Sequence, residues 1–443
     1  MSTLTTVIVI AFILGYALIA LEGFTKVNKA AIALLMFVVC WTLFMIDPLP
    51  YMGNISPGEV AAEVNNTIEK FLGSAGTTLF FLMGAMTIVE IVDQNGGFNF
   101  VRDALRTNNK RKLLWRIVFI TFFLSAILDN MTTSIVMIMV LRKLVAMRED
   151  RMLYSAAVII AANSGGAFSP IGDVTTIMLW NKNLITSQGV ITEIFFPSLV
   201  SALIPTLCMN FMFKGELTSP DLSPVDDGDE FTRRQRRIIF ALGVGGLIFV
   251  PIFKSITHLP PFVGILLVLG VLWFATELFY RSAHRKGGGM QKRVSNVLRK
   301  IDMTTILFFL GILMAVSCLE QIGVLQMLGD WLNKVSLGDH YIVTGAIGFL
   351  SSIVDNVPLV AGCMGMYTNL VGDFACDGLF WQLLAYCAGV GGSILIIGSA
   401  AGVVVMGLEK ISFGWYMKHI SWLVIVGYIA GILCYALINS FVR

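Results

Sequence analysis

The stretch ILDNMTTS, residues 127–134, places Asp129 and Asn130 side by side within an apolar run. The stretch SSIVDNVP, residues 351–358, repeats the pair as Asp355 and Asn356, 226 positions later. Each pair lies in the middle of an apolar segment that is long for one membrane span. We therefore expect each segment to form a re-entrant hairpin, two short helices around a turn that carries the pair. The predicted hairpins cover about 117–147 and about 341–372.

The composition indicates a membrane protein. Hydrophobic residues make up 56% of the 443 and charged residues only 13%, whereas a soluble domain carries about 25% charge. Many apolar runs approach or exceed the ~18 residues typical of a membrane span. The seven cysteines form no CxxC pair and mostly fall inside these runs, so we expect small buried side chains.

Ten spans are expected besides the two hairpins. They lie at about 5–22, 29–46, 76–92, 154–180, 192–212, 236–253, 259–280, 304–322, 381–410 and 418–440. This layout puts all but five of the 31 lysines and arginines on one side. The exceptions are Lys70, Lys182, Lys254, Lys334 and Arg443.

Basic loops remain in the cytoplasm, so both termini are expected outside it, in a multi-pass protein of the inner (plasma) membrane. The first hairpin then opens from the cytoplasm and the second from outside.

The two halves of the chain are related by a nearly constant interval. Gly165-Gly166 matches Gly391-Gly392 at the same 226 positions that separate the Asp-Asn pairs. Each half holds five spans and one hairpin, and because five is odd the halves lie in opposite orientations. Inverted repeats of this kind are typical of secondary transporters. The expected parts are 1–213, a cytoplasmic linker at 214–235, and 236–443.

The spans at 154–180 and 381–410 contain helix-breaking residues at membrane depth, where irregular backbone occurs only beside protein or water. In the first span these are Gly165, Gly166, Pro170 and Gly172. The oxygen-bearing side chains nearby are Asn163, Ser164, Ser169, Asp173, Thr175 and Thr176, with Ser393 and Ser399 in the second span. Two hairpin tips and two broken helices at the midplane would form one polar site whose exposed carbonyls suit a cation.

Three carboxylates fall in this predicted core, Asp129, Asp173 and Asp355, and no lysine or arginine falls there with them. Hard oxygen ligands with net negative charge fit Na⁺, Li⁺ or H⁺ and fit an anion poorly. A buried carboxylate can bind a proton or a sodium ion near neutral pH, but not both together. That competition is the minimal mechanism of an antiporter.

Each of these features also has a purely structural interpretation. An Asp-Asn pair often caps a helix, paired glycines allow close helix packing, and the hydroxyls of Thr175 and Thr176 can bond back to the preceding turn. Solvated carboxylates are normal near span ends, which is where Glu90, Asp93, Glu277 and Glu320 fall. The four histidines lie in loops or at span edges, as surface histidines do.

The paired Asp-Asn hairpins and the stretch Asn-Ser-Gly-Gly…Gly-Asp-Val-Thr-Thr at 163–176 resemble the NhaD-type sodium/proton antiporters of the ion transporter superfamily. The resemblance covers nearly the whole chain. It implies export of Na⁺ or Li⁺ in exchange for H⁺, favoured at alkaline pH, and a role in pH homeostasis. It also implies a homodimer with a scaffold domain and a moving transport domain, with no cofactor and no nucleic-acid partner.

By position, the resemblance assigns the cation site to a set of polar residues in both halves. They are Asp129, Asn130, Asn163, Asp173, Thr175, Thr176, Ser351, Asp355, Asn356 and Ser393. Relatives that carry dicarboxylates have Ser-Asn-Thr at both hairpin tips, whereas these tips read Asp-Asn-Met and Asp-Asn-Val.

Other functions remain open at this point. Within the same superfamily the alternatives are a sodium-coupled anion symporter and an arsenite exporter. Two broken helices could also line a channel, although inverted repeats with hairpins favour alternating access. A membrane enzyme is not indicated, because the sequence has no nucleophile–base pair, metal-ligand cluster or nucleotide loop.

Overall fold

The structure, a computed structural model, is built from helices. It describes residues 3–20, 27–52, 58–97, 104–105, 107–213, 215–217, 232–284, 297–336, 338–353 and 356–442. Within these residues the only β-type pairing is an isolated bridge between Asn109 and Glu216. The helices of at least eight residues are α1 (Thr3–Ala20), α3 (Lys29–Phe44), α4 (Val60–Gln94), α6 (Lys110–Leu128), α7 (Asn130–Leu144), α8 (Arg148–Ala167), α9 (Val174–Asn181), α10 (Ser187–Met212), α11 (Arg233–Thr257), α12 (Pro261–His284), α14 (Met303–Gln321), α15 (Val324–Val335), α16 (His340–Leu350), α17 (Asn356–Met366), α18 (Leu379–Gly391), α19 (Ala400–Glu409) and α21 (Trp422–Val442).

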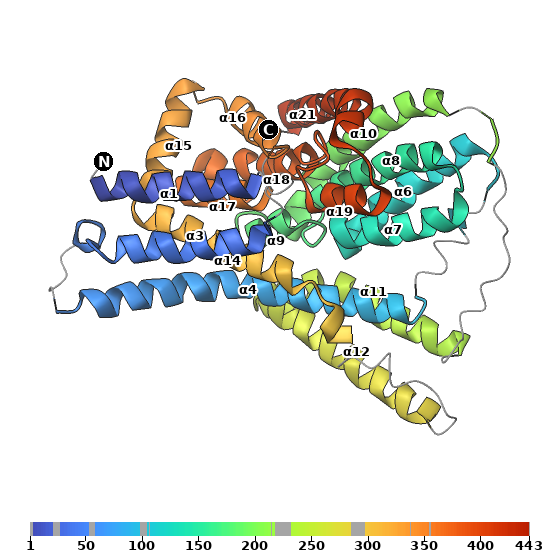
Figure 1. Ribbon diagram of the computed structural model, residues 1–443, viewed down its shortest axis with the longest axis horizontal. Coiled ribbons are helices and arrows are strands. Elements are labelled where there is room, and N and C mark those ends of the chain that lie inside the picture. The colour runs from blue at the N-terminus through green and yellow to red at the C-terminus, as the bar shows by residue number, and fades with distance from the viewer. Residues whose placement is uncertain are drawn as a thin grey trace.

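The helices form two packed groups, and Figure 1 shows α4, α11 and α12 of the first group below the second. The framework helices are α1, α3, α4, α11, α12 and α14, in which α3 packs on α14 and α12 packs on α4. The site helices are α6 to α10, α16 to α19 and α21, in which α6 packs on α8, α16 on α18 and α10 on α21. The groups meet where α4 contacts α9 and α14 contacts α17.

Six of the described helices are long and apolar enough to cross a membrane: α4, α10, α11, α12, α14 and the segment from Phe413 to Phe441. Helices α1 and α3 are apolar but slightly shorter. The chain is therefore a polytopic, all-α membrane protein. Helix α4 has 35 residues, roughly 52 Å of helix, and begins well before the span expected at 76–92.

Two expected spans are each divided into half-helices. The segment 154–180 forms α8 and α9, with irregular backbone between Ala167 and Val174. The segment 381–410 forms α18 and α19, interrupted between Gly391 and Ala400. The breaks coincide with the glycine-rich stretches, because glycine weakens a helix.

Each segment expected as a hairpin contains two helices. Helices α6 and α7 meet at Asp129, which has a φ of 92° and caps α7 by accepting a bond from the Thr132 backbone N–H at 2.8 Å. Helices α16 and α17 are separated by residues 351–355, of which Val354 and Asp355 lie outside the described part of the chain. In Figure 1, α6 and α7 lie on the right and α16 lies on the left.

Contacts between each hairpin and its broken helix recur at the interval of 226. The Ser125 hydroxyl on α6 donates to the Ala162 carbonyl on α8 at 2.6 Å. The Ser351 hydroxyl after α16 donates to the Ala388 carbonyl on α18 at 3.0 Å. Each residue of the second pair lies 226 positions after its counterpart in the first pair. The sequence interval therefore reflects matching side-chain contacts.

Gly165 and Gly391 allow the closest of these approaches. A Cβ at Gly165 would lie 2.1 Å from the Phe122 carbonyl oxygen, and a Cβ at Gly391 would lie 2.1 Å from the Gly348 carbonyl oxygen. These contacts are also 226 positions apart. In both places the hairpin backbone touches the broken helix at a position where a side chain does not fit.

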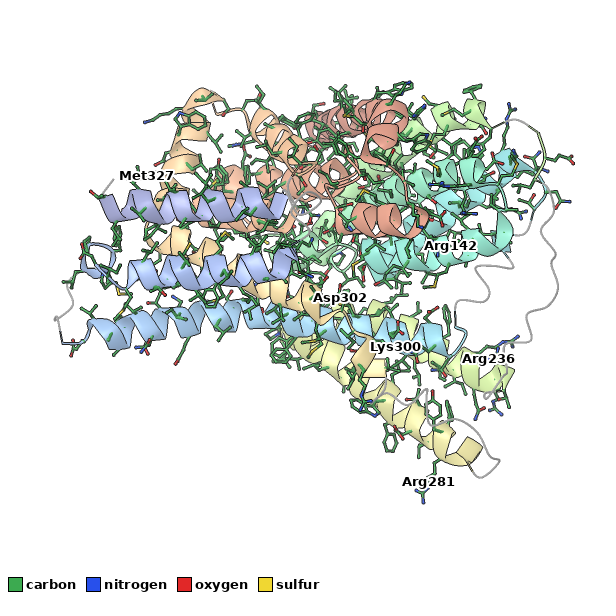
Figure 2. All side chains as sticks on the ribbon, viewed as in Figure 1. Arg142, Arg236, Arg281, Lys300, Asp302 and Met327 are labelled. Carbon is green, nitrogen blue, oxygen red and sulfur yellow. The ribbon has the colours of Figure 1, made fainter. Side chains whose placement is uncertain are left out.

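Basic residues gather at one end of the molecule. Figure 2 shows Arg142, Arg236, Arg281 and Lys300 in the right half, opposite Met327. Most of the predicted linker and of the basic tract before Lys300 lies outside the described residues. These four labelled residues are all among those that the sequence assigns to the cytoplasmic side.

The basic end is held by an ion-pair cluster on Glu409, the last residue of α19. Its carboxylate accepts from Arg142 Nε at 2.6 Å and from Arg151 Nε at 2.5 Å, and the side chain is 1% exposed. Arg142 also donates to the Leu408 carbonyl. The cluster therefore joins α7 and α8 to the C-terminal end of α19. Cations at this end also interact favourably with the helix dipole.

Replacing Glu409 with glutamine is expected to lower the unfolding free energy by about 2 kcal/mol, because two charge-assisted hydrogen bonds are lost. Thermal denaturation of the detergent-solubilised protein would measure the change. Glu149→Gln, which removes an exposed carboxylate in the first turn of α8, serves as the control. Equal stability of both variants and wild type would show that the cluster contributes little.

Candidate functional site

Four half-helices begin at one point in the middle of the site helices. Asn130 and Asn356 are the first residues of α7 and α17, the second helices of the hairpins. Asp173 caps α9, and its Oδ1 accepts the Thr175 backbone N–H at 3.0 Å. Ser399 caps α19, and its Oγ accepts the Gly402 backbone N–H at 3.1 Å. The broken helices and hairpins thus bring four positive helix ends together.

The carboxylate of Asp173 is the centre of this arrangement. Asn130 Nδ2 donates to Asp173 Oδ2 at 2.8 Å. Asn356 Nδ2 lies 3.2 Å from Oδ1 and 3.3 Å from Oδ2. The Thr175 hydroxyl donates to Oδ1 at 3.0 Å. The two equivalent asparagines of the hairpins, 226 positions apart, therefore bind one carboxylate.

Asn163 links this carboxylate group to the second broken helix. Its Oδ1 accepts from Asn130 Nδ2 at 3.0 Å. Its Nδ2 donates to Ser393 Oγ at 2.8 Å and to Ser399 Oγ at 2.9 Å. One continuous hydrogen-bond network thus runs from α7 through α8 to both sides of the break between α18 and α19. We call the residues of this network the Asp173 cluster: Asn130, Asn163, Asp173, Thr175, Asn356, Ser393 and Ser399.

The Asp173 cluster is buried. Asn163 and Ser393 are 0% exposed, Asp173 is 1% exposed, and Asn130 and Asn356 are 5% exposed. A buried carboxylate is costly unless hydrogen bonds or a positive charge compensate it. The amides and the helix ends supply part of that compensation. A proton or a small cation on the carboxylate would supply the rest, so the geometry suits reversible binding of a single positive charge.

Three of the remaining predicted site residues, Thr176, Asp129 and Ser351, lie beside the cluster rather than in it. Thr176 is adjacent, but its hydroxyl donates to the Asp173 backbone carbonyl at 2.8 Å. Asp129 binds Thr132 through both carboxylate oxygens, at 2.8 and 2.7 Å, and lines a small, mostly apolar pocket beside α4. The Ser351 hydroxyl binds α18, as described above. Asp355 lies outside the described residues.

Ser399 is the cluster member that the resemblance does not assign to the cation site, although the sequence places it near the second break. A signal for it existed, since Ser399 follows Asp173 by the repeat interval of 226. The two residues also have the same local role, because each caps the second half of a broken helix. The repeat therefore provides the same cap twice, once with a carboxylate and once with a hydroxyl.

Asp129 occupies a strained backbone conformation, with φ 92° and ψ 159°, a region that glycine populates almost alone. We expect Asp129→Ala to be less stable than Asp129→Gly by about 1–3 kcal/mol, because both variants lose the cap and only alanine keeps the strain. Thermal denaturation of the two variants measures this difference. Asp129→Asn keeps the capping oxygen and should stay near the wild type. An alanine variant as stable as the glycine variant would contradict the strain.

Comparison with known proteins places the chain in a family. The sequence profile of the citrate transporter family matches residues 16–384. Over 432 residues the chain is 43% identical to sodium/proton antiporter 1 of Arabidopsis thaliana, covering 97% of this chain and 72% of that protein. Sodium/proton antiporter 2 of the same plant is 40% identical over 435 residues, which cover 97% and 99% of the two chains.

A bacterial relative carries the same type of name. The Na⁺/H⁺ antiporter NhaD of Alkalimonas amylolytica is 31% identical over 464 aligned positions, covering 97% of this chain and 89% of that protein. The alignments with these three relatives each cover 97% of this chain, so they extend across both halves. The chain therefore belongs to the citrate transporter family and, within it, to the NhaD-type sodium/proton antiporters.

Proposed function

We propose that the protein is a secondary transporter, not an enzyme, that exchanges cytoplasmic Na⁺ or Li⁺ for external H⁺. The supporting observation is the buried Asp173 carboxylate, on which Asn130 and Asn356 from the two hairpins converge. The printed names of the relatives point to the same exchange. Na⁺ and H⁺ then compete for one negative charge, so binding of one ion releases the other.

The cation ligands in this proposal come from the Asp173 cluster. Asp173 provides the charge, and the side chains of Asn130, Asn163, Asn356, Thr175 and Ser393 carry neutral oxygens that suit a hard cation once the amide N–H groups of Asn130 and Asn356 turn away from Asp173. Asp129, Thr176 and Ser351 lie at or beside the turns between paired helices and the break in the first broken helix, and Asp355 lies outside the described residues. In that position they can join the coordination when the hairpins shift.

Alternating access in this proposal follows from two inverted repeats, each of five spans and one hairpin. The contacts that recur at 226 positions support the repeat, and the basic end in Figure 2 supports a cytoplasmic right side. Both termini would then lie outside the cytoplasm, in an inner (plasma) membrane protein. The site helices would move against the framework helices, in a homodimer.

The test is dequenching of a pH-sensitive dye in everted membrane vesicles. Vesicles that contain the protein are acidified and then given Na⁺, Li⁺ or K⁺ at pH 7 to 9. We expect dequenching by Na⁺ and Li⁺. Vesicles without the protein serve as the control. The absence of a response to any cation across this range would refute the exchange.

A sodium-coupled anion symporter is the rival function that needs a separate measurement, because the matching family profile is that of citrate transporters. Uptake of labelled citrate into right-side-out vesicles, with and without a sodium gradient, would detect a sodium-coupled anion symporter. We expect no uptake above the control, because the Asp173 cluster already holds a carboxylate among its amide donors.

A further inference from the structure

A cavity of about 390 Å³ lies where the framework helices meet the site helices. Its walls come from α4 and α14 of the framework and from α9 and α17 of the site helices. That volume holds roughly a dozen water molecules, enough for a monovalent cation with its hydration shell.

Oxygen-bearing side chains line much of this cavity. They are Ser74, Thr77, Thr78, Asn181, Ser317, Glu320, Tyr367 and Thr368. Asn181 Nδ2 donates to Thr78 Oγ1 at 3.2 Å. Asn181 Oδ1 is buried and accepts no hydrogen bond from the part of the chain that the structure describes. A buried carbonyl oxygen without a donor is a ready ligand for a cation or its water.

Glu320 contributes a carboxylate to the cavity from the end of α14. Its side chain is half-buried, and no residue in the described ranges donates a hydrogen bond to it or forms an ion pair with it. Lys182, an exposed residue, lines the same cavity and opposes its charge. The lining therefore carries one negative charge on the framework and one positive charge on the site helices, and Lys70 on α4 adds a second positive charge near Glu320.

The cavity adjoins the Asp173 cluster through a single half-helix. Helix α9 begins after Asp173 and ends at Asn181, which lines the cavity. Eight residues of helix correspond to roughly 12 Å. Helix α9 packs against α17, whereas α19 packs against α7 and ends at Glu409, which pairs with Arg142 on the basic side. The cavity thus lies at the end of the site opposite to the basic, cytoplasmic end.

We propose that this cavity is an outer vestibule that binds a hydrated Na⁺ or Li⁺, with Glu320 as the residue that attracts the cation on its path to or from Asp173. The proposal rests on the function proposed above and adds a second, external cation site to it. A carboxylate in a narrow polar cavity raises the local cation concentration. Lys182 lowers it by the same electrostatic rule.

The two charges allow a test in which the sign of the effect is predicted. Sodium-driven proton movement is measured in right-side-out vesicles, where added Na⁺ meets the outer face, and in everted vesicles, where it meets the inner face. We expect Glu320→Gln to raise the apparent KM for Na⁺ roughly threefold to tenfold in right-side-out vesicles. In everted vesicles the apparent KM should change by less than about twofold.

Lys182→Gln should lower the apparent KM in right-side-out vesicles by about twofold, because the positive charge in the cavity is lost. Glu277→Gln removes a carboxylate from the framework helix α12, away from the cavity lining, and should leave the KM at both faces unchanged. Raising the ionic strength with choline chloride should reduce the effect of Glu320→Gln, because salt screens the attraction.

An unchanged KM in the Glu320 variant, or the same rise at both faces, would overturn the vestibule. A rise confined to everted vesicles would place the cavity on the cytoplasmic side and would also overturn it. Failure of the proposed function gives a different result, since wild-type vesicles would then show no sodium-driven proton movement in either orientation.

Discussion

Replacing Asp173 with asparagine is expected to reduce sodium/proton exchange at least about a hundredfold, because a single carboxylate carries the charge that Na⁺ and H⁺ share. The change conserves the fold better than most, since asparagine caps a helix as well as aspartate does, and the cap on Thr175 can remain. It also places an amide opposite the amides of Asn130 and Asn356, where a carboxylate now accepts both.

Dye dequenching in everted vesicles measures the loss, and size-exclusion chromatography of the purified variant verifies the fold. The matched control is Asp302→Asn, because Asp302 is also an N-cap aspartate, on α14, and is exposed. That variant should keep at least half of the wild-type rate. An Asp173→Asn protein that retains more than a tenth of the rate would remove Asp173 from the centre of the mechanism.

Alanine at Gly165 or at Gly391 is expected to destabilise the protein by at least about 2 kcal/mol. The added Cβ would lie 2.1 Å from a backbone oxygen in each case, and backbone moves less easily than a side chain. Either hairpin would have to separate from its broken helix. Both contacts position helices that carry or adjoin residues of the Asp173 cluster, so the exchange rate should fall together with the stability.

Thermal denaturation of each variant, followed by intrinsic fluorescence, measures this effect. Gly270→Ala on α12 is the control, since a Cβ there has no atom within 4 Å and alanine is the better helix former by about 1 kcal/mol. It should melt at or slightly above the wild-type temperature. If Gly165→Ala melted like Gly270→Ala, the close approach between α6 and α8 would not be required.

The sequence predicts where the site lies better than it predicts which residues belong to it. The interval between the Asp-Asn pairs locates two pairs of short helices, and the glycine-rich stretches locate the breaks between α8 and α9 and between α18 and α19, because these signals are local and repeated. The direction in which a side chain points depends on its packing with residues that are distant in the sequence. Asp129 and Asn130 are neighbours in the sequence, yet only Asn130 reaches Asp173, whereas Asp129 turns to Thr132.

Two other features depend on more than the local sequence. The resemblance assigns Ser351 to the site, and in the structure its hydroxyl donates to the Ala388 carbonyl, just as the Ser125 hydroxyl donates to the Ala162 carbonyl in the first half. Helix α4 is longer than its apolar segment, since residues 60–75 mix polar and apolar side chains and still form helix. Hydropathy detects only the part of such a helix that is uniformly apolar.

The four helix ends that meet at the Asp173 cluster have a consequence for the evolution of substrate choice. N-terminal helix ends attract anions, so without Asp173 the four helix ends would form an anion-binding site. In this chain the carboxylate of Asp173, fixed at the start of α9, occupies that site, and the site then binds a mobile cation. A relative with a neutral residue at this position would leave the anion-binding site empty for a carboxylate from solution. One side chain can thereby decide which sign of charge the same scaffold carries.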